Sequence, residues 1–412
     1  MERVYGSAGF GGEEEERVAV SHEAIVKLFE SVGEKAEKLR DYILEDVKLV
    51  SECEELRKRL ILEKPGQASD GLMGVLPLRD ELNPEIGVAV DSTFPPEGGI
   101  DMVAGVLVGV VAGYVVYRGA EKLGIGKRGI QAYVDVLPRT DDLGKRVSER
   151  ARLLERRLVS SIIDKLPDGS VIVFDGEIVP YSLLYTRPRR SVTKSLDSEV
   201  SRLLLEASEK RIMLIGVVKR SYTRLFNVYA SLCGSRLKLN DKAIASIFLG
   251  PGEYTVLGVY TELLPGYAEV VAEEKGVRKI REVVETRLTE HPEYGRIVTG
   301  FYKPSRVPRA WQAVKIEVYA PWLEPREALR LAASHLDALT SPATGLPYPV
   351  DLVDELVRIE AAALEVVRHR LTKLLLRGLR GSRLHRVPVK PEDLMVVTLY
   401  TNPEKRYLYQ PR

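Results

Sequence analysis

The chain has 412 residues, of which 45% are hydrophobic and 29% are charged. This length and apolar content exclude a disordered chain and a small disulfide-stapled domain, and they allow two or three globular units. The 61 basic and 59 acidic side chains leave a net charge of +2, so no overall field favours a nucleic acid or a membrane. Any such partner must therefore be bound through a local patch.

Cysteine, asparagine and glutamine are all scarce in this sequence. The two cysteines, Cys53 and Cys233, have no Cys or His neighbour at metal-ligand spacing, so we expect neither structural zinc nor a disulfide scaffold. Few cysteines and an N-terminus without a signal-peptide pattern predict a cytoplasmic protein. Sparse amides beside abundant Arg, Glu and Lys are typical of a thermophile.

The N-terminal part of the chain predicts helices. Apolar residues recur at helical spacing between 21 and 63, which indicates one or two long amphipathic helices with a candidate break at Gly33. The stretch 64–83 is rich in Pro and Gly and predicts a connector. We therefore separate a leader with helices at 1–83 from a core at 84–380 and a tail at 381–412.

An apolar run at 102–117 raises the question of a membrane span. A transmembrane helix needs about 18 to 20 apolar residues, and this run is shorter and rich in valine, as buried strands are. We predict a strand here and no membrane association. With the flanking runs 85–94 and 131–137 it predicts a three-stranded meander.

Strands alternate with helices through the rest of the core. We expect helices at 141–165, 195–210, 220–232, 240–248, 323–339 and 350–378, and strands at 170–176, 211–218, 254–260, 296–303 and 313–319. This alternation predicts an α/β fold with a mixed sheet.

Two of the predicted strands end in an aspartate, Asp91 in the first and Asp175 in the fourth. Acidic residues are depleted from strands and costly to bury without a partner. Ligand sites form at strand ends of α/β sheets, although a residue that only caps a turn would stand at the same place.

The order of these features is that of a ribonuclease-H-like core: an Asp on the first strand, two antiparallel strands, a helix with a Glu, and a fourth strand with another Asp. Clustered carboxylates repel one another unless divalent cations neutralise them, and oxygen ligands select Mg²⁺ or Mn²⁺. Two such ions about 4 Å apart can stabilise the attacking and leaving oxygens of a phosphodiester. We therefore predict a mixed sheet flanked by helices, with an N-terminal helical extension, that hydrolyses nucleic acid.

Four stretches of the core resemble the archaeal-type NurA family of DNA-repair nucleases. They are VAVDSTFP at 88–95, VIVFDGEIVP at 171–180, LIGVVKRS at 214–221 with NDKAIASIFLGPGEYTVLG at 240–258, and GLPYPVDLVDELVRI at 345–359. The resemblance implies a homodimeric nuclease that uses two Mn²⁺ or Mg²⁺ ions. It further implies degradation of single-stranded DNA, 5′ to 3′ resection of duplex ends in recombination, and a hexameric HerA ATPase as partner.

The resemblance also implies the metal ligands. Asp91 and Asp175 match the ligands on the first and fourth strands of the family. On the helix between them, Glu155 fits the next ligand position best, and Glu149 is the alternative.

A last ligand follows the Gly-Leu-Pro-Tyr-Pro stretch at 345–349. The family has a His or an acidic residue there, and this chain has Asp354. Asp351 is the alternative if the register differs by one turn. Because a carboxylate also binds Mn²⁺, an Asp in place of His is compatible with catalysis.

Basic residues are candidates for contacts with DNA. Lys219 and Arg220 match a basic pair of the family that would position the scissile phosphate, unless they are an exposed pair at a helix start. Arg187, Arg189 and Arg190 form a proline-stiffened loop suited to phosphate contacts, although solubility also explains such a cluster.

Two further features are peripheral candidates. An aromatic and basic strip suits the stacking of unpaired bases, or else a core or interface role, and it comprises Tyr302, Lys303, Arg306, Arg309 and Trp311. Asp241 either caps the helix that follows it or lies near the site.

The sequence contains no phosphate-binding GxxxxGK[ST] motif, so we expect no ATP hydrolysis by this chain. Any powered movement along DNA would need a partner, in agreement with a HerA-like ATPase. The alternative function is a non-catalytic subunit of the same fold that binds DNA or docks on the ATPase. In either case the amphipathic pattern at 21–63 suggests contacts with a second copy or with the partner.

Overall fold

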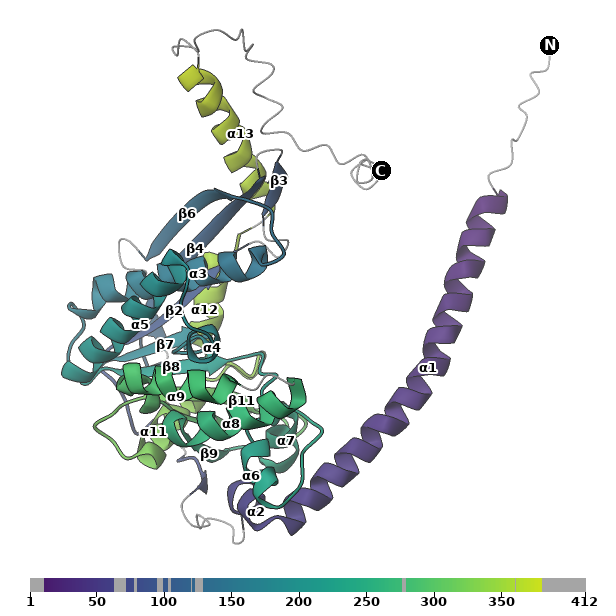
Figure 1. Cartoon of the computed structure of the whole chain (residues 1–412), viewed down its shortest axis with the longest axis vertical. Helices are drawn as coiled ribbons and strands as arrows, with labels where there is room; N and C mark the ends of the chain where they lie inside the picture. The colour runs from purple at the N-terminus through teal and green to yellow at the C-terminus, as the bar shows by residue number, and fades with distance from the viewer. Residues whose placement is uncertain are drawn as a thin grey trace.

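The computed structural model describes residues 11–62, 72–77, 80–94, 99–102, 105–119, 121–122, 129–275, 279–359 and 361–379. The tail expected at 381–412 lies outside them. Within these ranges the chain forms one mixed sheet with helices on both faces, while α1 extends away from the body (Figure 1).

The strands are β1 (Met73–Val75), β2 (Gly87–Thr93), β3 (Ile100–Met102), β4 (Gly105–Arg118), β5 (Glu121–Lys122), β6 (Ile130–Leu137), β7 (Val171–Asp175), β8 (Met213–Val218), β9 (Glu253–Val259), β10 (Val298–Tyr302) and β11 (Val314–Tyr319). The helices are α1 (Gly11–Glu52), α2 (Glu54–Leu60), α3 (Leu143–Ile163), α4 (Tyr181–Tyr185), α5 (Ser191–Glu209), α6 (Asn227–Leu232), α7 (Asp241–Phe248), α8 (Tyr260–Lys275), α9 (Ile280–Glu290), α10 (Pro292–Gly295), α11 (Pro325–Ala338), α12 (Tyr348–Val357) and α13 (Ala361–Leu379).

The centre of the sheet has the expected ribonuclease-H-like order. The predicted meander is confirmed, because β4 pairs antiparallel with both β2 and β6. Beyond α3, β7 pairs parallel with β2, and β8 pairs parallel with β7. The strand order is therefore β6, β4, β2, β7, β8, and β11, β10, β9 and β1 continue the sheet by antiparallel pairing.

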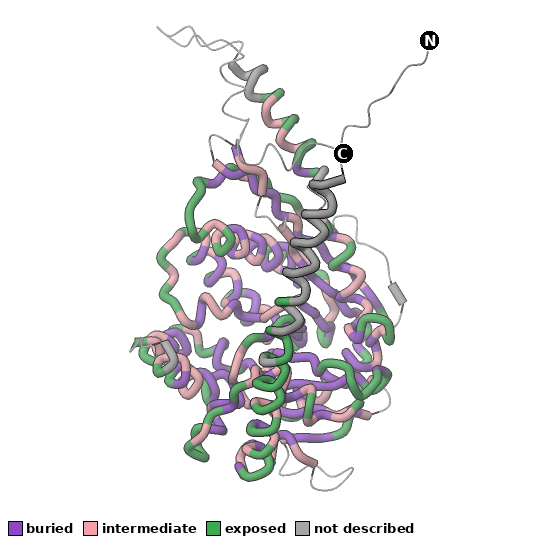
Figure 2. Tube along the Cα trace, turned by 90° about the vertical axis from the view of Figure 1, so that its right-hand side faces the viewer, coloured by how far each residue is buried: buried purple, intermediate pink, exposed green. Residues whose placement is uncertain are grey.

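Alternating side chains of the central strands pack into two separate cores. In β2, Val88 and Val90 belong to a core that includes side chains of α3, α5 and α8, whereas Ala89 belongs to one that includes α11 and α12. The strands β7 and β8 divide in the same way. The sheet is thus buried on both faces, which explains the nearly continuous apolar runs of its strands. Figure 2 shows the buried residues gathered in this body.

The valine-rich run is a strand and not a membrane helix, as predicted. Its glycines let helices approach β4: a Cβ on Gly113 would lie 2.8 Å from a methyl group of Val357, and one on Gly109 would lie 2.7 Å from Leu364. Among the described residues, no helix combines the length and apolar character that crossing a bilayer requires.

The N-terminal helices differ from the prediction in two ways. Helix α1 continues through Gly33, and the chain breaks at Cys53 instead. Cys53 forms a disulfide with Cys233, at the end of α6, so the expectation of no disulfide was wrong. Spacing along the chain gave no sign of it, because 180 residues separate the two cysteines. Asp46 also links α1 to the chain after α6, because its carboxylate accepts hydrogen bonds from the amides of Lys238 and Leu239.

Two predicted helices have different bounds. The helix expected at 220–232 begins only at Asn227, because Asp241 accepts hydrogen bonds from the amides of Leu225 and Phe226 and holds the preceding loop. The helix expected at 350–378 is two helices, α12 and α13. The region between β9 and β10 also forms α8 and α9, which the sequence reading left unassigned.

Candidate metal centre

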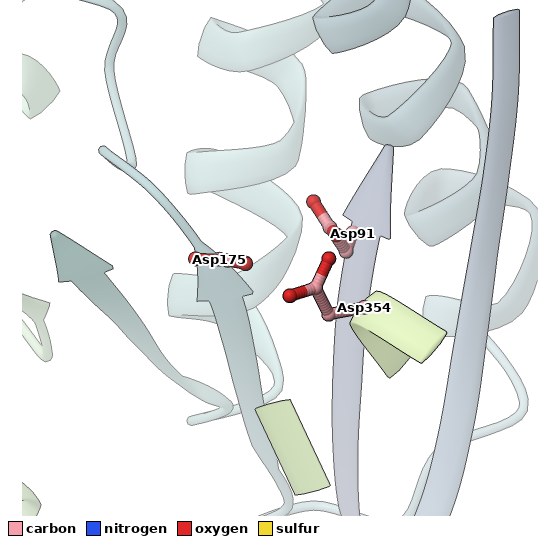
Figure 3. Close-up of side chains that lie close together, drawn as sticks. All are labelled: Asp91, Asp175 and Asp354. Carbon is pink, nitrogen blue, oxygen red and sulfur yellow. The ribbon is translucent and has the colours of Figure 1, made fainter. Parts of the chain in front are cut away.

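Three aspartate carboxylates meet at one end of the central strands (Figure 3). Asp91 lies near the end of β2, Asp175 is the last residue of β7, and Asp354 reaches in from α12. One oxygen of each lies within 4.8 Å of the other two. Asp91 is only 7% exposed, whereas the side chain of Asp354 is 61% exposed. The cluster is therefore buried on one side and open on the other.

The strand register brings the first two carboxylates together. The parallel ladder pairs Val90 with Phe174, so the next residue on each strand, Asp91 and Asp175, emerges at the same edge. Two residues before the aspartates, Ala89 in β2 and Val173 in β7 belong to the core that includes α12. Because side chains alternate along a strand, Asp91 and Asp175 lie on that same face of the sheet. Because α12 packs closely over Gly113, Asp354 can reach the same point.

Burial of these like charges disfavours their ionised forms. Burial, followed by the charges of Asp175 and Glu155, raises the pKa of Asp91 to about 8. Burial also raises the pKa of Asp175 to about 6, although the nearby Lys219 ammonium opposes this rise. Without a cation, the cluster therefore retains protons that ordinary aspartates lose.

Lys219 is the basic side chain that contacts the cluster. Its Nζ lies 2.7 Å from Asp175 Oδ2 and 3.3 Å from Asp354 Oδ2. Burial alone would lower the pKa of Lys219, but the two carboxylates raise it. Lys219 stands in a loop and does not begin a helix, and Lys242 holds that loop by donating to the Lys219 carbonyl at 2.7 Å. Arg220 is exposed.

Glu155 lines the same small cavity as Asp91 and Asp175, which has a volume of about 150 Å³. Its carboxylate accepts a hydrogen bond from Ser92 Oγ at 2.8 Å and pairs with Arg156. Glu155 is thus near the three aspartates but held by donors of its own. Its charge contributes to the raised pKa of Asp91.

Arg156 is a residue of this site that the sequence reading missed. Its side chain is 1% exposed and stacks on the Phe174 ring, with the guanidinium carbon 3.9 Å from the ring centroid. Besides pairing with Glu155, it donates to the carbonyls of Glu177 at 2.6 Å and Ile178 at 3.1 Å. Arg156 therefore ties Glu155 to the turn that follows Asp175. An Arg in a charge-rich helix gives no pattern that would reveal this.

A second buried acid, on strand β11, supports the turn that follows Asp175. Glu317 accepts hydrogen bonds from the Ile178 amide at 3.0 Å and from the Tyr181 hydroxyl at 3.2 Å. Its counter-charge is Lys315, with Nζ 3.4 Å from Glu317 Oε1, and both side chains are fully buried. This pair belongs to strand β11 and was also missed.

The structure separates the alternatives that the sequence left open. Glu149 lies on α3 but accepts from Thr193 Oγ1 at 2.9 Å, away from the three aspartates. Asp351 accepts from Thr344 Oγ1 at 2.5 Å and is outside the cluster.

Asp241 is buried under the loop at Thr223 to Phe226, where it holds backbone amides. It is neither near the site nor the helix cap, because Asn240 caps α7.

The remaining basic candidates fall into two groups. Arg187, Arg189 and Arg190 line one cavity of about 410 Å³ together with Glu149. In the predicted stacking strip, Arg306, Arg309 and Trp311 are exposed. Tyr302 and Lys303 are instead buried, and Lys303 donates to the Ser246 carbonyl at 2.9 Å. The strip is therefore not continuous, because Tyr302 packs in the core at the end of β10 and Lys303 reaches the Ser246 carbonyl in α7.

The donor set of the cluster fits a divalent cation. Asp91, Asp175 and Asp354 offer oxygen atoms at mutual distances that one ion can span. Oxygen-only sites suit Mg²⁺ and Mn²⁺, and the single ammonium of Lys219 does not balance three carboxylates.

A family model for the NurA domain matches residues 100–359, which is more than half of the chain. The chain belongs to the NurA family. The resemblance expected from the sequence is thereby confirmed. The NurA match contains Asp175, Lys219 and Asp354 but begins after Asp91, which the strand pairing alone places beside them.

Solved NurA structures are similar to this chain at low identity. The NurA nuclease from Sulfolobus solfataricus is 13% identical, with a TM-score of 0.48, over 87% of this chain and 99% of that one. A NurA structure with dAMP and manganese is 12% identical, with a TM-score of 0.44, over 82% of this chain and 96% of that one. No curated protein sequence matches the chain.

Proposed function

We propose that this chain is a divalent-metal-dependent DNA nuclease. The observation that carries the proposal is the convergence of Asp91, Asp175 and Asp354 at the ends of adjacent strands in a NurA family member. Asp91, Asp175 and Asp354 hold two Mn²⁺ or Mg²⁺ ions, with Glu155 as a further ligand. When bound, such cations supply Lewis-acid catalysis of phosphodiester hydrolysis.

The protein side chains orient the substrate and the ligands. Lys219 carries a positive charge at the open side of the cluster and binds a non-bridging oxygen of the scissile phosphate. Arg156 keeps Glu155 and the Asp175 turn at a fixed separation. Arg220 and Trp311 are exposed and contact the DNA strand further out.

A nuclease assay tests this function. Single-stranded DNA labelled at its 5′ or 3′ end is incubated with Mn²⁺, Mg²⁺ or EDTA, and the product lengths give the direction of digestion. We expect cleavage with Mn²⁺ or Mg²⁺, none in EDTA, and none by Asp91→Asn. Asp351→Asn is the matched control, because this aspartate lies outside the cluster. DNA binding without cleavage under any divalent ion would instead favour the non-catalytic subunit.

Membership in the family supports a proposal for the wider role. We place the activity in the repair of DNA ends, with 5′ to 3′ resection, as a homodimer that works with a HerA-like hexameric ATPase. Helix α1 supports a partner or dimer contact, because it extends from the body and exposes Val32, Leu39 and Leu44 (Figure 1). The substitutions Val32→Ser, Leu39→Ser and Leu44→Ser should then abolish the dimer or the ATPase complex in size-exclusion chromatography with light scattering, and the core residues of 46–60 stay in place.

A cytoplasmic location remains part of the proposal despite the disulfide. Intracellular proteins of hyperthermophiles often contain disulfides. The sparse amides of this sequence are in keeping with such a source.

A further inference from the structure

A second cavity lies beside the metal centre, on a neighbouring face of α3. It is lined by residues of α3, of the loop from α4 to α5, and of α9, and its volume is about 410 Å³. Four of its lining side chains are basic, namely Lys145, Arg187, Arg189 and Arg190, and Glu149 is the acidic one. The cavity is therefore positively charged.

Most of this positive charge has no counter-charge within the described part of the chain. Arg190 is the exception, since its guanidinium lies 3.0 Å from Asp142 and 3.8 Å from Glu149. Glu149 is further engaged by Thr193. Lys145, Arg187 and Arg189 form no ion pair with a described residue. These three side chains are exposed, so an anion that binds among them is attracted by three cations, and salt weakens this attraction.

The cavity is close enough to the metal centre for one DNA strand to reach both. Glu149 lines it, Glu155 lines the cavity of Asp91 and Asp175, and Glu155 lies six positions after Glu149 on α3. At 1.5 Å per residue this separation is about 9 Å along the helix axis. Such a span corresponds to a few nucleotides of a strand rather than to a separate binding event.

We infer that this arginine cavity binds a DNA backbone phosphate a few nucleotides from the scissile bond. The inference rests on the proposed nuclease function, which supplies the DNA strand. Arg187 and Arg189 hold the phosphate oxygens, because guanidinium groups form paired hydrogen bonds with them. Arg190 is less exposed than these two arginines and is held by Asp142 and Glu149. The cavity thus sets how the strand enters the metal centre.

Salt-dependent DNA binding tests the cavity separately from cleavage. In EDTA, fluorescence anisotropy gives the affinity for a labelled single strand between 50 and 300 mM KCl. Each lost phosphate contact should reduce the slope of log affinity against log salt by about 0.7. We therefore expect Arg187→Gln and Arg189→Gln each to lower the slope by about that amount, and the double variant by about 1.4. Arg326→Gln is the control. This exposed arginine belongs to α11, which packs in a different core from α3 and so lies on the other face of the sheet.

The outcomes separate this inference from the nuclease proposal. An unchanged slope in the double variant, or an equal reduction of the slope in Arg326→Gln, overturns the proposed phosphate site even when the wild type cleaves DNA. A reduced slope with no cleavage by the wild type in Mn²⁺ supports the cavity and overturns the nuclease. Equal effects with 5′-hydroxyl and 5′-phosphate strands identify a backbone phosphate, and an effect confined to the 5′-phosphate strand identifies a terminal one.

Discussion

Two buried acids of the same sheet, Glu317 and Asp91, differ in how their charge is balanced. Glu317 has a fully buried lysine, a backbone amide and a tyrosine hydroxyl as partners. Asp91 lies in a cluster of three carboxylates that shares one partly exposed lysine. Groups of the fold balance the charge of Glu317, whereas the ionised aspartate cluster has more carboxylates than cations and can therefore bind a cation or protons.

The largest expected effect is on catalysis. Asp175→Asn removes a charged ligand from the cluster, and we expect Mn²⁺-dependent cleavage of single-stranded DNA to fall more than about 100-fold, beyond the range of outer-shell changes. The measurement is the initial rate on an end-labelled strand. Activity within a few-fold of the wild type would remove Asp175 from the site.

The next largest expected effect is on the stability of the fold, where Glu317 and Asp91 should differ. Glu317→Gln leaves Lys315 buried without its counter-charge, so we expect a loss of about 3–5 kcal/mol in the free energy of unfolding. In EDTA, Asp91→Asn should cost nothing or stabilise the fold. Urea unfolding in EDTA gives both values, and pairing Glu317→Gln with Lys315→Met should recover part of the loss. Equal losses in the two single variants would contradict the comparison.

A third prediction concerns Arg156, which pairs with Glu155 and also holds the turn that Glu317 supports. Arg156→Met keeps most of the side-chain volume but releases Glu155 from the turn after Asp175, so we expect activity or Mn²⁺ affinity to fall about 10–100-fold. The apparent Mn²⁺ affinity from rate against metal concentration is the readout. Arg157→Met is the control, because Arg157 is exposed on the same helix. A similar loss in the control would mean that net charge, and not positioning, is responsible.

The smallest effect is a pH dependence of stability. Because the folded pKa of Asp91 is raised to about 8, the folded state holds a proton that the unfolded chain has lost above about pH 4. Stability in EDTA should therefore fall as the pH rises, by roughly 2 kcal/mol between pH 6 and pH 8. Thermal or urea unfolding of the wild type and of Asp91→Asn checks this. The variant should show a flatter profile, and identical profiles would argue against the buried cluster.

The central strands and the strand-end aspartates could be predicted from the sequence. Valine-rich runs and the order of features were sufficient for the meander and for β7, because local pattern and tertiary burial agree there. The side chains that meet through tertiary packing could not be predicted. Arg156 and the disulfide of Cys53 with Cys233 depend on contacts between residues far apart in the sequence. Lys315 and Glu317 share one face of a predicted strand, but the local sequence does not show that this face is buried.

Helix boundaries show a similar limit. Asp241 was read as a cap for the helix that follows it, whereas its carboxylate holds the amides before α6 and shortens that helix. In the predicted stacking strip, Tyr302 and Lys303 are buried, because the sheet is covered on both faces. In both cases tertiary contacts that the local sequence does not reveal decide where the side chain lies.

Binding of Mn²⁺ in the absence of DNA tests the central claim most directly. Isothermal titration calorimetry compares the wild type with Asp91→Asn and with the Asp351→Asn control. The aspartate cluster predicts saturable binding by the wild type and by Asp351→Asn, and loss of that binding in Asp91→Asn. Equal binding by all three proteins would contradict a metal centre formed by Asp91, Asp175 and Asp354.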